Sequence, residues 1–288
     1  MFDLATADFL LQWAAGGMFF CWVTTRRREV SIGYGWTIRG TYLVVALLGL
    51  AAGLAFGVNP VREVSTAAVA GVTAVALIQS WTRRKAGVRG QRQIAEARSE
   101  RVAAMTGIDR AETAKTIGGP EFNPRLDLAA ALVGLPGIVA AGIAAGDSPV
   151  LLVARMIAGA ALLGVVTDAM LLGHWYLVQP GMSREPLNEL VRWTAVLWLP
   201  HTVLFLVPTG MISALDGTIQ DGYDGMLGYF WVGCVIATIA LVFITMAALK
   251  ERQYSAVMAA TGLLYLAILT AFGMDLVARA ILAIGEST

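Results

Sequence analysis

Charge is almost missing from long stretches of this chain, and that pattern limits what the chain can fold into. Only 14% of its 288 residues are charged and 57% are hydrophobic, whereas a soluble domain carries about 25% charged residues. A chain this poor in charge cannot cover a water-facing surface, but it can cover one that faces a lipid bilayer. The sequence therefore predicts an all-α, polytopic transmembrane helix bundle, because unpaired backbone groups are too costly in hydrocarbon.

Eight apolar stretches are long enough to cross a bilayer, which takes about 20 helical residues. They cover residues 4–23, 41–59, 66–81, 128–146, 150–178, 190–215, 226–249 and 256–284. We interpret residues 1–288 as a single integral membrane domain. The first stretch carries Asp3 and Asp8 nearby instead of Lys or Arg, which indicates a retained span and not a signal peptide.

Positive charge gathers in alternate connections between these stretches. Residues 24–40, 82–127, 179–192 and 250–255 hold 4, 10, 2 and 2 Lys or Arg residues, which is 18 of the 21 in the chain. The remaining connections are acidic instead, with Asp147, Asp216, Asp221 and Asp224. Because cytoplasmic loops carry the excess of Lys and Arg, the pattern predicts a plasma (inner) membrane protein. Its basic loops are expected in the cytoplasm and both of its ends outside.

The long basic connection, 82–127, is a candidate contact site for a partner. Residues 88–105 are rich in Arg, Gln, Glu and Ala, a composition that favours a helix docked to anionic lipid or to a cytosolic subunit. A solvated loop that only fixes the topology would explain the same composition. The net charge of the whole chain is +1, which gives no case for nucleic-acid binding.

Small residues mark places where helices are expected to pack closely. Two GxxxG stripes comprise Gly49, Gly53, Gly57, Gly142 and Gly146. Such stripes let helix backbones approach each other in lipid. The partner helix belongs either to this chain or to another membrane subunit.

Four ionisable residues stand inside the apolar stretches: Asp168, His201, Asp275 and Arg279. A charge there costs roughly 2.5–3.5 kcal/mol on insertion scales, so such residues usually serve a function. Asp168 and His201 lie roughly 15 Å deep by helical rise on consecutive spans, which pack side by side. We expect them to face each other as a catalytic, proton-exchanging pair. The alternative is a hydrogen-bonded pair that only fixes helix register. Asp275 and Arg279 are four residues apart and are expected to pair.

A second cluster is predicted near the basic end of the fifth span. His174, Trp175 and Tyr176 follow one another there, and Arg192 lies on the next span. Such a set suits a quinone headgroup or a lipid phosphate, although an ordinary aromatic belt explains it equally well. The two histidines differ in depth by roughly 9 Å, which disfavours a bis-His haem and leaves a His/Met haem open. No metal site is predicted, since zinc takes three or four ligands.

Two prolines, Pro200 and Pro208, lie inside the sixth span. Each removes a backbone donor and frees a carbonyl one turn earlier, so a kink or break is expected. Broken helices of this kind line substrate sites in transporters. Pro136 is expected to act similarly in the fourth span. No internal repeat is detectable in the sequence, which counts against a transporter.

Three functions remain open after these observations. The first is a membrane subunit of a redox or energy-transducing complex, with a quinone or proton site around spans five and six. The second is a small-substrate or ion transporter, and the third is a structural or assembly subunit. The chain contains no GxSxG, HExxH, Walker or dinucleotide-binding motif in a plausible context, which argues against a soluble enzyme. Whether the chain is an enzyme in the membrane stays open.

Overall fold

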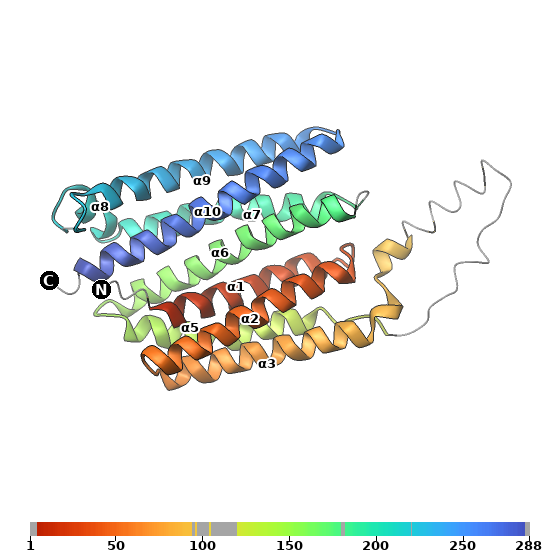
Figure 1. Ribbon diagram of the computed structural model, residues 1–288, viewed down its shortest axis with the longest axis horizontal. Helices are drawn as coiled ribbons and strands as arrows, with labels where there is room; N and C mark the ends of the chain where they lie inside the picture. Colours follow the sequence, from red (N-terminus) through yellow and green to blue (C-terminus); the bar gives the residue numbers. More distant parts are fainter. Residues whose placement is uncertain are drawn as a thin grey trace.

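The protein, described here by a computed structural model, is a bundle of long helices that run side by side (Figure 1). The structure describes residues 5–93, 96, 104, 120–179, 182–219 and 221–285, and the regular structure in these residues is helical. The long helices are α1 (Thr6–Thr25), α2 (Ile32–Phe56), α3 (Pro60–Thr82), α5 (Arg125–Ala144), α6 (Pro149–Val178), α7 (Glu185–Leu206), α9 (Met226–Lys250) and α10 (Tyr254–Gly285). Two short helices are η1 (Arg84–Ala86), after α3, and α8 (Gly210–Leu215), after α7.

Six of the helices in the described residues are long and apolar enough to cross a membrane: α2, α3, α5, α6, α9 and α10. Their outward sides carry large hydrophobic side chains exposed to the surroundings, among them Leu54, Val64, Ile143, Ile236 and Leu269. An apolar surface of this extent is unsuited to water and suited to lipid. The prediction of a multi-pass helical membrane protein is therefore supported by composition and by the way the helices present their side chains.

The long helices form two four-helix rings that meet along α1 and α6. Helices α1, α2, α3 and α5 pack around the first ring in chain order, and α6, α7, α9 and α10 pack around the second in the same order. The first helix of one ring packs against the first helix of the other. This repeated packing order was not detectable in the sequence, because helices can pack alike without sharing side chains.

The connections alternate between the two ends of the bundle (Figure 1). Helices α1, α3, α6 and α9 all finish at one end, and the connections that follow them are the basic ones of the sequence. We call this the basic end. The connections after α2, α5 and α7 lie at the opposite end, together with α8, the start of α1 and the end of α10. In the part of the chain that the structure describes, the basic connections therefore adjoin one end of the bundle.

Among the helices that begin earlier than the sequence predicted, α2 and α3 differ the most. Helix α2 begins at Ile32 and not at 41, so that Arg39 lies inside it, and α3 begins at Pro60 and not at 66. In both helices the added turns contain charged side chains that are buried in ion pairs, namely Arg39 in α2 and Arg62 in α3. Hydropathy counts such residues as polar, but pairing removes much of the cost of burying them.

The predicted span 190–215 is broken at Pro208, one of its two prolines. Helix α7 ends at Leu206, and α8 starts only at Gly210. Pro208 has no N–H, which leaves the carbonyl of Leu204 without its helical donor. Arg155 of α6 supplies donors instead, from Nε to the Leu204 oxygen at 2.9 Å and from Nη2 to the Val207 oxygen at 2.7 Å. Pro136 and Pro200, in contrast, stay within helices α5 and α7.

The glycine stripes contact helices of this same chain. A Cβ at Gly49 would lie 3.1 Å from Leu10 Cβ, one at Gly53 would lie 2.2 Å from the Glu63 carboxylate, and one at Gly142 would lie 2.7 Å from Val153. At Gly57 a Cβ would meet nothing within 4 Å. The close approaches thus serve packing inside the bundle.

In the predicted surface helix, residues 89–93 are helical, but most of 88–105 lies outside the described residues.

Asp221 closes the start of α9 and gives a first testable prediction. Its Oδ1 accepts hydrogen bonds from the N–H groups of Tyr223 (2.8 Å) and Gly225 (3.0 Å), and its Oδ2 accepts from Leu227 (2.9 Å). Burial alone would raise the pKa of this carboxyl, but the backbone donors outweigh it and hold the pKa below its usual value.

The stability that Asp221 contributes is present above the pKa of the unfolded chain and is lost as the pH falls through the lower, folded pKa. We therefore expect Asp221→Asn to lower the thermal midpoint at neutral pH and to match the unmodified protein in acid. Melting curves followed by circular dichroism across this pH range measure the difference. The exposed neighbour Asp224 provides the control, since Asp224→Asn should not change the pH dependence. A pH-independent loss in Asp221→Asn would contradict the explanation.

Candidate functional site

Four polar side chains from three helices meet inside the bundle. His201 of α7 and Asp275 of α10 are fully buried, and their Nε2 and Oδ1 atoms are 2.9 Å apart. Arg279, one turn after Asp275, donates from Nε to Asp275 Oδ2 at 2.6 Å and from Nη2 to Gln12 Oε1 at 2.6 Å. The predicted pairing of Asp275 with Arg279 is thus confirmed. We call these four residues the His201 centre.

Helix α6 makes room for this centre with a glycine. A Cβ at Gly159 would lie 2.9 Å from Gln12 Oε1, 3.0 Å from Asp275 Oδ1 and 3.1 Å from Arg279 Nη2. Any larger residue at position 159 would press on all three groups. On the other side, the ring of Phe205 packs edge-on against the His201 imidazole, with 4.9 Å between ring centroids. The centre is therefore enclosed by α1, α6, α7 and α10.

The hydrogen bonds fix how the protons are arranged in the His201 centre. Asp275 accepts donors at both carboxylate oxygens, which is the arrangement of an ionised carboxylate. Its Oδ1 therefore requires a proton on His201 Nε2. The other ring nitrogen, Nδ1, is buried and has no hydrogen-bond partner among the described residues. It is consequently the ring nitrogen that the bond to Asp275 leaves open.

The predicted contact between Asp168 and His201 is not formed. Asp168 Oδ1 accepts a hydrogen bond from the Tyr42 hydroxyl of α2 at 2.6 Å, and His201 bonds to Asp275 instead. The remaining polar atoms of the two side chains, Asp168 Oδ2 and His201 Nδ1, have no hydrogen-bond partner in the described part of the chain. Depth and adjacency of the spans suggested the pair, but the rotation of each helix about its axis decides the contact. Asp168 faces α2, whereas His201 faces α10.

The predicted cluster of His174, Trp175, Tyr176 and Arg192 does not converge on one place. His174 is exposed and its Nδ1 lies 3.1 Å from the Tyr265 hydroxyl. The Trp175 indole donates to Ser31 Oγ at 2.7 Å, and the Tyr176 hydroxyl donates to the carbonyl of Ser183. Arg192 lies on an exposed part of α7. Three consecutive residues of a helix point in different directions, so these side chains do not line a common pocket.

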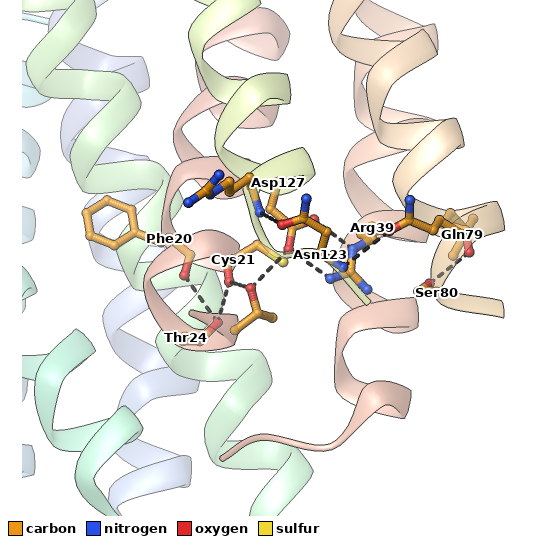
Figure 2. A network of polar contacts seen from close by, with 11 residues as sticks. Phe20, Cys21, Thr24, Arg39, Gln79, Ser80, Asn123 and Asp127 are labelled. Carbon is orange, nitrogen blue, oxygen red and sulfur yellow. Dashed lines mark hydrogen bonds and ion pairs between the residues drawn. The ribbon is translucent and has the colours of Figure 1, made fainter. Parts of the chain in front are cut away.

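A buried ion pair near the basic end was missed by the sequence reasoning (Figure 2). Arg39 of α2 donates to both carboxylate oxygens of Asp127 of α5, from Nε at 2.7 Å and from Nη2 at 2.8 Å. Thr25 of α1 adds a third donor to Asp127 at 3.0 Å, and the ring of Phe122 lies 3.9 Å from the guanidinium carbon of Arg39. Both residues had been assigned to loops because they border apolar stretches. Their opposite charges on flanking segments were the only available signal.

A second buried charge cluster lies toward the opposite end of the first ring. Arg62 of α3 donates to Asp8 of α1 at 2.7 Å and to its neighbour Glu63 at 2.9 Å. All three side chains are buried. Two carboxylates share one guanidinium here, and the arrangement holds α1 against α3.

The residues that the structure describes offer few groups that could bind a metal or a cofactor. They contain no group of three or more His, Cys, Asp or Glu side chains arranged to hold a metal ion. Cys21 and Cys234 are buried and unpaired with each other. Comparisons of the chain with models of known protein families, with curated proteins and with solved structures find no match.

Proposed function

We propose that this chain is an eight-span membrane subunit of an energy-transducing complex whose His201 centre exchanges protons within the plasma membrane. The two helices beyond the six apolar ones, α1 and α7, complete the two rings. Helix α1 packs against α2, α5 and α6, so that its polar residues are kept from lipid. In this proposal the basic end faces the cytoplasm and both ends of the chain lie outside.

The unpartnered Nδ1 of His201 is the observation that carries the proposal. A buried polar atom without a partner costs free energy, and a structural histidine usually satisfies both of its nitrogens. Here Asp275 and Arg279 fix the orientation of the ring and leave one nitrogen available. An oriented imidazole with one open nitrogen is the usual arrangement for proton transfer.

The side chains of His174, Trp175, Tyr176 and Arg192 do not converge, which leaves a quinone without a defined site. The proposal therefore rests on proton exchange at the His201 centre. Purification in mild detergent tests the complex itself. Copurifying subunits, together with bound quinone or a haem absorption band, would support an electron-transfer complex. A lone, colourless protein would count against it.

A proton-coupled transporter is the second candidate, and two observations favour it. Helix α7 breaks at Pro208, two turns after His201, and the chain is built as two rings with the same packing order. Discontinuous helices and paired halves are common in transporters. Uptake of a solute by the purified protein in proteoliposomes, lost in His201→Gln, would favour this function over the first.

The protonation of His201 can be measured directly because the chain has only two histidines. We expect the ¹⁵N spectrum of histidine-labelled protein to show His201 with a proton on Nε2 and a second signal, Nδ1, that changes with pH. Asp275→Asn should disturb the Nε2 preference, since the carboxylate that enforces it is gone. The exposed His174 is assigned through His174→Gln, which serves as the control.

The functional counterpart is proton movement in proteoliposomes that enclose a pH-sensitive dye, with the purified complex and its driving reaction. His201→Gln should abolish the proton signal and His174→Gln should retain it. If Nδ1 of His201 keeps one protonation state from acid to alkaline pH and His201→Gln moves protons normally, the proposal is wrong.

A further inference from the structure

Asp168 is a buried carboxyl group that has no cationic partner among the residues that the structure describes. It is fully enclosed, its Oδ1 accepts from the Tyr42 hydroxyl, and its Oδ2 is buried with no hydrogen-bond partner among the described residues. The titratable groups that face it are Cys21 of α1, Tyr34 and Tyr42 of α2, and Asp127 of α5. None of them is positively charged at neutral pH. In the described part of the chain, the ion pair nearby is that between Arg39 and Asp127, and its two charges neutralise each other.

An ionised carboxylate in such a place is unfavourable. Removing a lone charge from water costs several kcal/mol, and a single neutral hydrogen bond repays only a part of this cost. A bound proton removes the charge and leaves a neutral acid that still accepts from Tyr42. We propose that Asp168 is a second proton-binding site, distinct from the His201 centre and reached from the basic end. The inference deepens the proposed proton-handling function, but its test reads a different residue.

Polar groups connect Asp168 with the basic end along successive turns of α1. Gly17 packs against the Tyr42 ring, where a Cβ would lie 1.8 Å from it. One turn further along α1 stands the buried thiol of Cys21, and one turn beyond that Thr25 bonds to Asp127. Figure 2 shows Cys21, Arg39 and Asp127 gathered at this level.

A small cavity opens where this path reaches the basic end. It has a volume of about 30 Å³ and is lined by residues that include Thr25, Ser31, Arg39 and Phe122. A space of this size holds one or two water molecules when polar groups surround it. Phe122 lies over Arg39 and separates the ion pair from the surroundings. The cavity with its ion pair is therefore the entry that we assign to the proton.

The way from Asp168 to the His201 centre is closed by contrast. Gly159 adjoins Asp275, and Asp168 stands nine residues further along α6, which is roughly 14 Å by helical rise. Between them α1 and α6 touch through their backbones, where a Cβ at Gly164 would lie 2.3 Å from the carbonyl carbon of Gly16. A direct proton transfer cannot span this distance, so the two sites exchange protons separately.

Infrared difference spectroscopy of the full chain in lipid nanodiscs tests the site. At neutral pH we expect a carbonyl stretch from a protonated carboxylic acid that moves to lower frequency in D₂O and is lost in Asp168→Asn. Tyr42→Phe, which removes only the hydrogen bond at Oδ1, should keep the band and move it to higher frequency. Asp224→Asn and His201→Gln should leave it unchanged. A missing band in the unmodified protein, or one that survives Asp168→Asn, would overturn the proposal.

The rate at which the band responds to D₂O tests the entry route. Phe122→Ala uncovers the Arg39–Asp127 pair and should accelerate the exchange several-fold, while the lipid-facing change Phe243→Ala should not. Equal rates in both variants would show that the proton does not enter at the basic end.

The ¹⁵N signal of His201 is recorded on the same samples. A titrating His201 without an acid band therefore refutes only the site at Asp168, and an acid band without a titrating His201 refutes only the proposed function.

Discussion

Replacing Asp127 by Ala is expected to lower the free energy of unfolding by about 3–5 kcal/mol, the usual cost of removing one partner from a buried ion pair. Arg39 is 1% exposed and Asp127 is fully buried, so the remaining guanidinium could not turn to water. Of its described contacts it would keep the ring of Phe122. Thermal or denaturant unfolding in detergent, followed by circular dichroism, measures the loss.

A double variant tests whether the stranded charge is the reason for the lower stability. Replacing both partners by apolar residues of similar size, as in Arg39→Met with Asp127→Leu, removes the stranded charge and should recover most of the stability. The surface pair of Arg26 and Glu189 is the matched control. Because the Arg26 side chain is 37% exposed, Arg26→Ala should cost at most about 1 kcal/mol. A double variant no more stable than Asp127→Ala would contradict this account.

The helical membrane architecture could be predicted from the sequence because this architecture depends on quantities that add up along the chain. Apolar length and the placement of Lys and Arg require no knowledge of neighbours, and they led to helices whose basic connections share one end. The same additivity explains the errors at Arg39 and Arg62. A buried charge is tolerated only with its partner, and the partners Asp127 and Asp8 lie far away in the sequence.

The candidate site could be predicted from the sequence only in part. The rarity of charge inside apolar stretches identified Asp168, His201, Asp275 and Arg279, and local spacing correctly paired the last two. Which spans face each other at a given depth depends on helix rotation and on packing between rings, so His201 was assigned to the wrong carboxylate. Gln12 was overlooked, since an amide in the first helix becomes meaningful only once Arg279 is seen to bind it.

The second large effect on stability is expected at the contact between the two rings. A Cβ at Gly16 would lie 1.7 Å from the carbonyl oxygen of Ala160 and 2.5 Å from its carbonyl carbon. These atoms belong to helix backbone, which cannot move aside as a flexible side chain would. Overpacked sites cost about 1–3 kcal/mol when neighbours can adjust, and occasionally more. We expect Gly16→Ala to reach or exceed the upper end of that range, with the loss seen as a lower thermal midpoint.

Glycines that meet no neighbour should respond in the opposite direction. At Gly262 in α10 a Cβ would meet nothing within 4 Å, and replacing a helical glycine by Ala stabilises a helix by about 0.5–1 kcal/mol. Gly262→Ala is therefore expected to raise the midpoint while Gly16→Ala lowers it. Two equal shifts would mean that α1 and α6 are not in backbone contact. Opposite shifts would establish the close crossing that joins the two rings and separates Asp168 from the His201 centre.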